Sequence, residues 1–119
     1  MNAEFRWFGT GPLSPDTLGI EGVVVHLGVR MDSRRACYIK VKNARDGFSR
    51  TNSFDLDFAG HRRGKCTISL MQKEQVIQWM EQSRRTIIRY WERPFSSMDC
   101  INMLRPWTPA VGENTQVTP

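Results

Sequence analysis

Apolar and polar residues alternate with a period of two in four stretches of the first part of the chain. These stretches span residues 21–29, 34–42, 52–59 and 65–70. In the first of them Val23, Val25 and Leu27 fall on one face, and in the third Phe54 and Leu56 do so. A period of two is typical of a pleated strand with one buried face. Because no helical pattern separates the four stretches, they predict an antiparallel sheet.

The second part of the chain changes to the helical period. Apolar residues recur on one side of a helix that begins near Ser69 or Met71 and ends at about Arg93, before Pro94. Ser69 and Gln72 are spaced as in a capping box. Arg84 falls near the centre of the apolar side, so we expect it to reach a carboxylate, to extend to solvent or to lie at the edge of a subunit contact.

Together these patterns predict an α+β fold with an antiparallel four- or five-stranded sheet, one long amphipathic helix and a flexible C-terminal tail. Residues 4–8 are the candidate fifth strand, at an edge, and residues 9–19 are predicted to form a loop. We expect one short turn around Met98, Ile101 and Leu104. The predicted domain spans residues 1–107, and residues 108–119 form the tail.

Length and composition narrow the class of protein. The chain has 119 residues, of which 39% are hydrophobic and 24% are charged. A chain of this length and composition can form one folded domain without disulfides or metals. The apolar runs are far shorter than a membrane span, and the N-terminus lacks the apolar core of a signal peptide. Three widely spaced cysteines fit neither a disulfide framework nor a zinc cluster. We therefore expect a cytoplasmic or nucleoid-associated protein with no metal and no cofactor.

Positive charge is concentrated in one window of the chain. Residues 30–65 contain ten basic and four acidic residues, a net charge of +6, whereas the whole chain has a net charge of +5. Such an asymmetry is typical of a surface that binds a polyanion, although solubility alone can also require it.

Catalytic motifs are poorly supported by the spacing of the polar residues. His26 and His61 have no carboxylate at a spacing that would define a triad or a metal motif. Asp55 and Asp57 share one face of a strand, which leaves a metal-dependent nuclease as an alternative. We predict no catalytic residue and a protein that is not an enzyme.

Binding of single-stranded nucleic acid requires basic side chains for the phosphates and aromatic rings for the unpaired bases. The basic window meets both requirements, because Tyr38 and Phe48 are interleaved with its Lys and Arg residues. The opposing interpretation is that Tyr38 covers a second core layer and that Phe48 tucks under its own loop. The predicted nucleic-acid-binding residues are Arg34, Arg35, Tyr38, Lys40, Lys42, Arg45, Phe48, Arg50, Arg62, Arg63 and Lys65.

A short motif links the predicted sheet to the helix. The segment Lys65-Cys66-Thr67-Ile68-Ser69-Leu70 leads directly into a helix that contains Glu74-Gln75 and Trp79. This arrangement resembles the single-stranded-DNA-binding transcriptional coactivator family, with Met71-Gln72 in place of the family's Asn-Pro and Val76 in place of a tryptophan after Gln75. The resemblance implies a homodimer formed through the helices and binding of unpaired DNA by the strands. Its binding positions would be Tyr38, Lys40, Lys42, Arg62, Arg63 and Lys65.

The aromatic content of the helix also suggests self-association, because a monomer of this size does not need so many large apolar side chains on one helix. The predicted dimerisation residues are Val76, Trp79, Met80, Ile87 and Trp91. We thus expect an accessory protein of replication, transcription or repair that binds single-stranded DNA or RNA. The alternative is a small protein-interaction module or inhibitor whose basic window meets an acidic protein surface, with Phe95, Met98, Ile101 and Trp107 adding apolar contacts.

Overall fold

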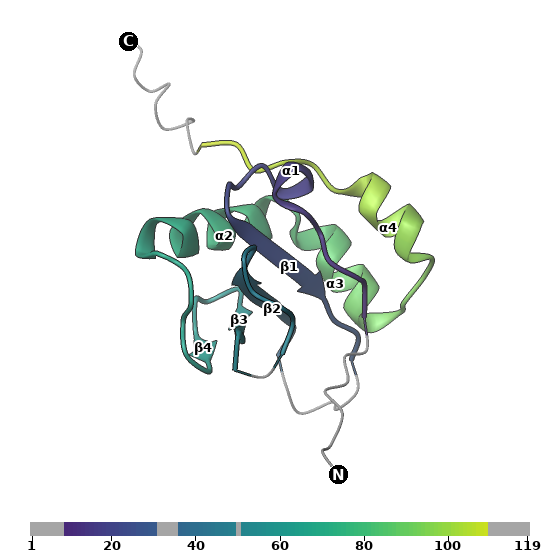
Figure 1. The fold of residues 1–119 in the computed structure, drawn as a ribbon. Coiled ribbons are helices and arrows are strands. Elements are labelled where there is room, and N and C mark those ends of the chain that lie inside the picture. Colours follow the sequence, from purple (N-terminus) through teal and green to yellow (C-terminus); the bar gives the residue numbers. More distant parts are fainter. Residues whose placement is uncertain (1–8, 31–35, 50, 110–119) are drawn as a thin grey trace.

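The computed structural model describes residues 9–30, 36–49 and 51–109, and it has the α+β architecture that the sequence predicts (Figure 1). The candidate strand at residues 4–8 lies outside the described residues. In chain order the elements are α1 (Pro15–Leu18), β1 (Val23–Leu27), β2 (Tyr38–Asn43), β3 (Ser53–Asp57), β4 (Arg62–Arg63), α2 (Leu70–Gln82), α3 (Arg84–Glu92) and α4 (Ser97–Met103).

The four strands form one antiparallel sheet in the order β1-β2-β3-β4. The first three lie inside the predicted stretches or differ from them by one residue. The predicted fourth strand at residues 65–70 is wrong, because the chain leaves the sheet at Gly64, whose φ of 103° is unfavourable for other residues. Cys66 and Ile68 nevertheless pack against the core from the irregular segment that leads to α2.

The predicted single helix is two helices, α2 and α3, separated at Ser83. The Ser83 N–H donates to the carbonyls of both Trp79 and Met80, at 2.9 and 3.2 Å, and the Ser83 carbonyl then accepts the first bond of α3 from Ile87. A straight helix over this span would be about 35 Å long, whereas strands of five or six residues span about 17–20 Å. The break lets α3 return to the end of β1. The predicted capping box of Ser69 and Gln72 is confirmed at the start of α2.

The segment before β1 is more ordered than the predicted loop. It contains the single turn α1, capped by the Ser14 hydroxyl and followed by Gly19 with a φ of 72°. Isolated bridges join Gly9 to Gly28 and Leu13 to Val25, so the segment lies along the outer edge of β1. Leu18, the last residue of α1, is fully buried.

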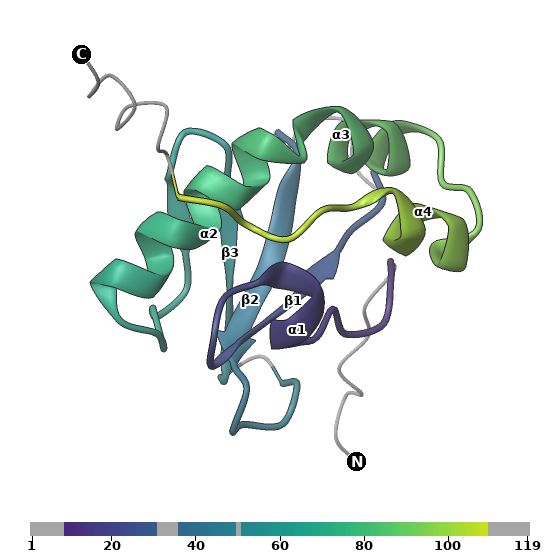
Figure 2. The ribbon, with the colours of Figure 1, turned by 90° about the horizontal axis from the view of Figure 1, so that it is seen from above.

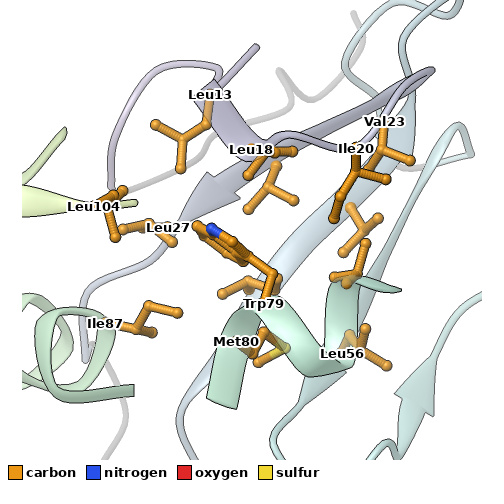
Figure 3. Close-up of a cluster of buried hydrophobic side chains, with 14 of the residues drawn as sticks. Leu13, Leu18, Ile20, Val23, Leu27, Leu56, Trp79, Met80, Ile87 and Leu104 are labelled. Atoms are coloured by element: carbon orange, nitrogen blue, oxygen red, sulfur yellow. The ribbon is translucent and has the colours of Figure 1, made fainter. Parts of the chain in front are cut away.

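The core lies between the sheet and the helices, with Trp79 among side chains from α1, β1 and α3 (Figure 3). Four of the five predicted dimerisation residues, Val76, Trp79, Met80 and Ile87, belong to this core and are at most 1% exposed. Trp91 is also buried, with its ring against Tyr38. The side chains chosen for a dimer contact therefore stabilise the single chain, which corrects that assignment.

The C-terminal part of the described chain packs on the helices. The predicted short turn around Met98 is the helix α4. Residues 104–109 then run as an extended segment between α1 and α2 (Figure 2). Thr108, where we placed the start of the tail, exchanges two hydrogen bonds with the Gln82 side chain. No helix within the described ranges is long and apolar enough to cross a membrane.

Candidate nucleic-acid interface

The face of the sheet opposite α2 has a row of polar side chains that crosses all four strands. The register places His26, Lys40, Asp55 and Arg63 next to one another in that order. The Lys40 ammonium lies 2.5 Å from the Asp55 carboxylate, and both side chains are mostly buried. The positive charge of Lys40 is thus balanced within the protein, so we do not place Lys40 among the phosphate contacts.

The loop after β2 folds back over this face. The Lys42 ammonium donates to the backbone carbonyls of Asn43 and Asp46, and Lys42 is buried. The Phe48 ring stacks on the His26 imidazole at a centroid distance of 3.7 Å, with 11° between the planes. Lys42 is therefore buried, and the half-buried Phe48 ring has one face covered by His26.

His26 belongs to this internal arrangement. Burial lowers the pKa of its imidazole below the usual 6.5, although the hydrogen bond to the Thr10 carbonyl raises it, and the nearby Lys42 charge lowers it further. A neutral imidazole at neutral pH favours close stacking beneath Phe48. His26 is therefore a packing residue beneath the loop.

A small pocket of about 250 Å³ lies where the start of β2 meets the hairpin between β3 and β4. Three predicted binding residues, Tyr38, Arg62 and Arg63, line it together. Both arginines are exposed, and the Arg62 guanidinium is oriented by a 2.6 Å bond to the Gly64 carbonyl. Lys65 follows them on the same exposed segment. The hairpin thus joins an aromatic side chain to a cluster of cations.

The hairpin is held by Asp57, whose Oδ1 accepts hydrogen bonds from the backbone N–H groups of Ala59 and His61, at 3.0 and 2.9 Å. Gly60, with a φ of 87°, provides the left-handed residue of this turn. The His61 imidazole lies 3.3 Å from Asp57 Oδ2. Ala36, Asp57 and His61 complete the pocket, and none of the three was among the predicted binding residues. The spacing from Asp57 to Gly60 was the available signal for this turn.

Tyr38 forms one wall of the pocket and is half buried. Its ring lies edge-on to the Trp91 indole, with the centroids 5.0 Å apart. This contact orients the tyrosine, and such aromatic pairs contribute about 0.5–1.5 kcal/mol beyond their buried area.

Asp55 and Asp57, the carboxylates of the nuclease alternative, have different surroundings. Asp55 is paired with Lys40 on the sheet, and Asp57 holds the hairpin. Across residues 9–30, 36–49 and 51–109, no group of three or more His, Cys, Asp or Glu side chains is placed to hold a metal ion.

The remaining predicted contacts are separated from this pocket or are not described. Arg45 is exposed and bonded to the Asn43 side chain, at the opposite end of β2 from Tyr38. Arg34, Arg35 and Arg50 lie outside the described residues.

Two further side chains near the site have identifiable partners, and Arg84 is one for which the sequence predicted a carboxylate. The Arg84 guanidinium reaches a carboxylate, forming bonds of 2.9 and 3.0 Å to Glu81, and it also lies over the Phe58 ring at 4.4 Å. Burial raises the pKa of the Cys37 thiol to about 12, so this group is protonated at neutral pH and packs against the core.

Comparison with known proteins adds no assignment to this geometry. No protein-family model matches the chain, and neither the curated proteins nor the solved structures contain a match.

Proposed function

We propose that the protein binds single-stranded nucleic acid at the edge of the sheet, without catalysing a reaction, in an accessory role in replication, transcription or repair. The observation that carries the proposal is the pocket that combines Tyr38 with Arg62 and Arg63. Guanidinium groups attract phosphates of any sequence, and an aromatic wall offers an unpaired base a surface on which to stack. The resemblance to the single-stranded-DNA-binding coactivators supports the same class of partner.

The proposed interface is smaller than the one predicted from the sequence. It consists of Tyr38, Arg62, Arg63 and Lys65, because the charge of Lys40 is balanced by Asp55 and the ammonium of the buried Lys42 donates to backbone carbonyls. The edge strand β4 is short and consists of two arginines, so it is also a poor template for strand addition by another protein. Nucleic acid is therefore a better partner for this edge than an extended peptide.

Removing the cationic group should weaken the dependence of binding on salt. For single strands, the logarithm of affinity falls with the logarithm of salt concentration at a slope of about 0.7 per phosphate contact. We expect the triple variant Arg62→Ala/Arg63→Ala/Lys65→Ala to flatten this slope by about 2. Titrating a fluorescent single-stranded oligonucleotide at several salt concentrations measures the change.

The matched control is Arg85→Ala/Arg93→Ala/Arg105→Ala, which removes three exposed positive charges from α3, its C-cap and the C-terminal segment. This control should lose little of the slope. Equal slopes for the two triple variants would show that only net charge matters and would contradict the proposed interface. Tight binding of an acidic protein by a chain that ignores oligonucleotides would favour the protein-interaction alternative.

Tyr38 should contribute to affinity by a different mechanism. We expect Tyr38→Leu, which keeps an apolar contact for Trp91 but loses the planar ring, to cost about 1–2 kcal/mol of binding free energy. Because no charge changes, the salt slope should stay nearly constant. The same titration, repeated with thermal unfolding of the variant as the control for folding, separates a stacking role from a structural one. Unchanged affinity in a folded variant would remove Tyr38 from the interface.

A further inference from the structure

The Asp57 carboxylate brings an oriented acceptor to the proposed binding pocket. Two backbone hydrogen bonds fix Oδ1, so the direction of the whole carboxylate is fixed. Its second oxygen, Oδ2, faces the His61 imidazole at 3.3 Å, and the His61 side chain is 82% exposed. A ligand can therefore displace the imidazole toward solvent and take its place on Oδ2 while the hairpin stays intact.

The nucleobases differ in what they offer to such an acceptor. Cytosine and adenine carry an exocyclic amino group that donates hydrogen bonds, whereas thymine has a carbonyl oxygen at the equivalent position. Guanine also carries an exocyclic amino group, and uracil has the carbonyl pattern of thymine. Where the carboxylate meets this exocyclic group rather than the ring N–H of thymine or uracil, it attracts the amino group and repels the carbonyl oxygen.

The size of the pocket limits what can enter it. Its volume of about 250 Å³ is below the roughly 300–1,000 Å³ typical of sites for drug-sized ligands. A hollow of this size suits a single base beside Tyr38, and the exposed Arg62 and Arg63 side chains lie near enough to meet its phosphate.

We infer that one unpaired base enters this pocket and that Asp57 selects bases with an exocyclic amino group over thymine and uracil. The inference rests on the proposed function, since it concerns the same site. It adds a base preference to a surface whose cations bind every sequence. The chemistry is common to DNA and RNA, because the amino group and the carbonyl belong to the base.

Cytosine and thymine provide the sharpest comparison, because both are pyrimidines of similar size. We expect the unmodified protein to bind a single-stranded oligodeoxycytidine of about ten nucleotides roughly tenfold more tightly than the matching oligothymidine. A tenfold ratio of affinities is the effect expected of one hydrogen bond to a charged group. Among RNA oligonucleotides of equal length, oligocytidine should likewise be bound more tightly than oligouridine. Fluorescence anisotropy at neutral pH measures all four affinities.

Asp57→Asn tests the role of the acceptor directly. The asparagine Oδ1 can still accept the Ala59 and His61 backbone N–H groups, but its amide nitrogen replaces Oδ2 with a donor. The cytosine preference should therefore disappear or reverse toward thymine. Asp99→Asn, in the distant helix α4, removes the same charge and should keep the roughly tenfold preference.

The possible failures can be told apart. Equal binding of cytosine and thymine by the unmodified protein would overturn the base preference while single-strand binding stands. A cytosine preference that survives in a folded Asp57→Asn variant would equally overturn the role of Asp57. Absence of binding to all four oligonucleotides would overturn the proposed function itself.

Discussion

Replacing Trp79 with alanine should lower the free energy of unfolding by about 3–5 kcal/mol, the range for truncating a large buried aromatic residue. Trp79 is fully buried in the centre of the core (Figure 3). Its indole N–H also donates to the Arg105 carbonyl at 3.0 Å, so the side chain connects α2 to the C-terminal segment. Because whole domains are stable by only about 5–15 kcal/mol, this loss is a large fraction of the total. Denaturant unfolding followed by circular dichroism measures it.

Trp79→Phe is the matched variant, since it keeps an aromatic ring in the core but loses the bond to Arg105. We expect a smaller cost than for alanine, made up of the lost hydrogen bond, about 1 kcal/mol, and the lost ring volume. If Trp79 acts within one chain, the unfolding midpoint should not change with protein concentration. A midpoint that rises with concentration, together with a sedimenting species larger than 13.8 kDa, would restore the dimer interpretation.

The three longer strands were predictable because apolar residues recur at every second position in each of them, and this alternation is visible in a short window, even though β1 is buried on both faces. β4 was not predictable from the sequence, because it has only two residues and both are arginines. Its place in the sheet depends on pairing with Asp55 and Leu56 across the hairpin rather than on any pattern of its own. The apolar alternation at residues 65–70 reflects packing of Cys66 and Ile68 outside the sheet.

The break at Ser83 was not predictable from periodicity. Apolar residues continue on a helical repeat on both sides of it, and the need for a break comes from the length of the sheet that the helix covers. The assignment of these helix residues to a dimer contact was wrong for a related reason, whereas the dimer itself stays a prediction. A sheet alone would not cover both Trp79 and Ile87. Leu18 of α1 and Cys100 of α4 also contribute to the same core.

The candidate site was only partly predictable. Alternation placed Tyr38, Lys40 and Lys42 together, yet it could not show that Asp55 and the Asp46 carbonyl would bond the two lysines. These partners come from other strands and loops, so they depend on the register of the sheet. The position of Asp57 in the pocket likewise follows from the register between β2 and β3, which sets it opposite Tyr38.

Trp107 provides the second large test of the fold, because no periodicity in the sequence predicts where its segment packs. Its backbone N–H donates to the Leu18 carbonyl at 2.6 Å, and its indole N–H donates to the Gln78 side chain at 2.9 Å. A Cβ added to Gly19 would lie 2.9 Å from the Pro106 side chain, which shows how closely this segment approaches α1. The segment therefore joins α1 and α2 across the core.

We expect Trp107→Ala to lower the free energy of unfolding by about 3 kcal/mol, at the low end for tryptophan truncation because the side chain is only partly buried. The backbone bond to Leu18 survives in this variant, so the loss reports on the indole. Gln78→Ala, which removes only the side-chain partner, should cost about 1 kcal/mol. Combining the two changes should cost less than their sum, because both remove the same hydrogen bond. Full additivity, or a Trp107→Ala variant as stable as the original chain, would mean that residues 104–109 do not pack between α1 and α2.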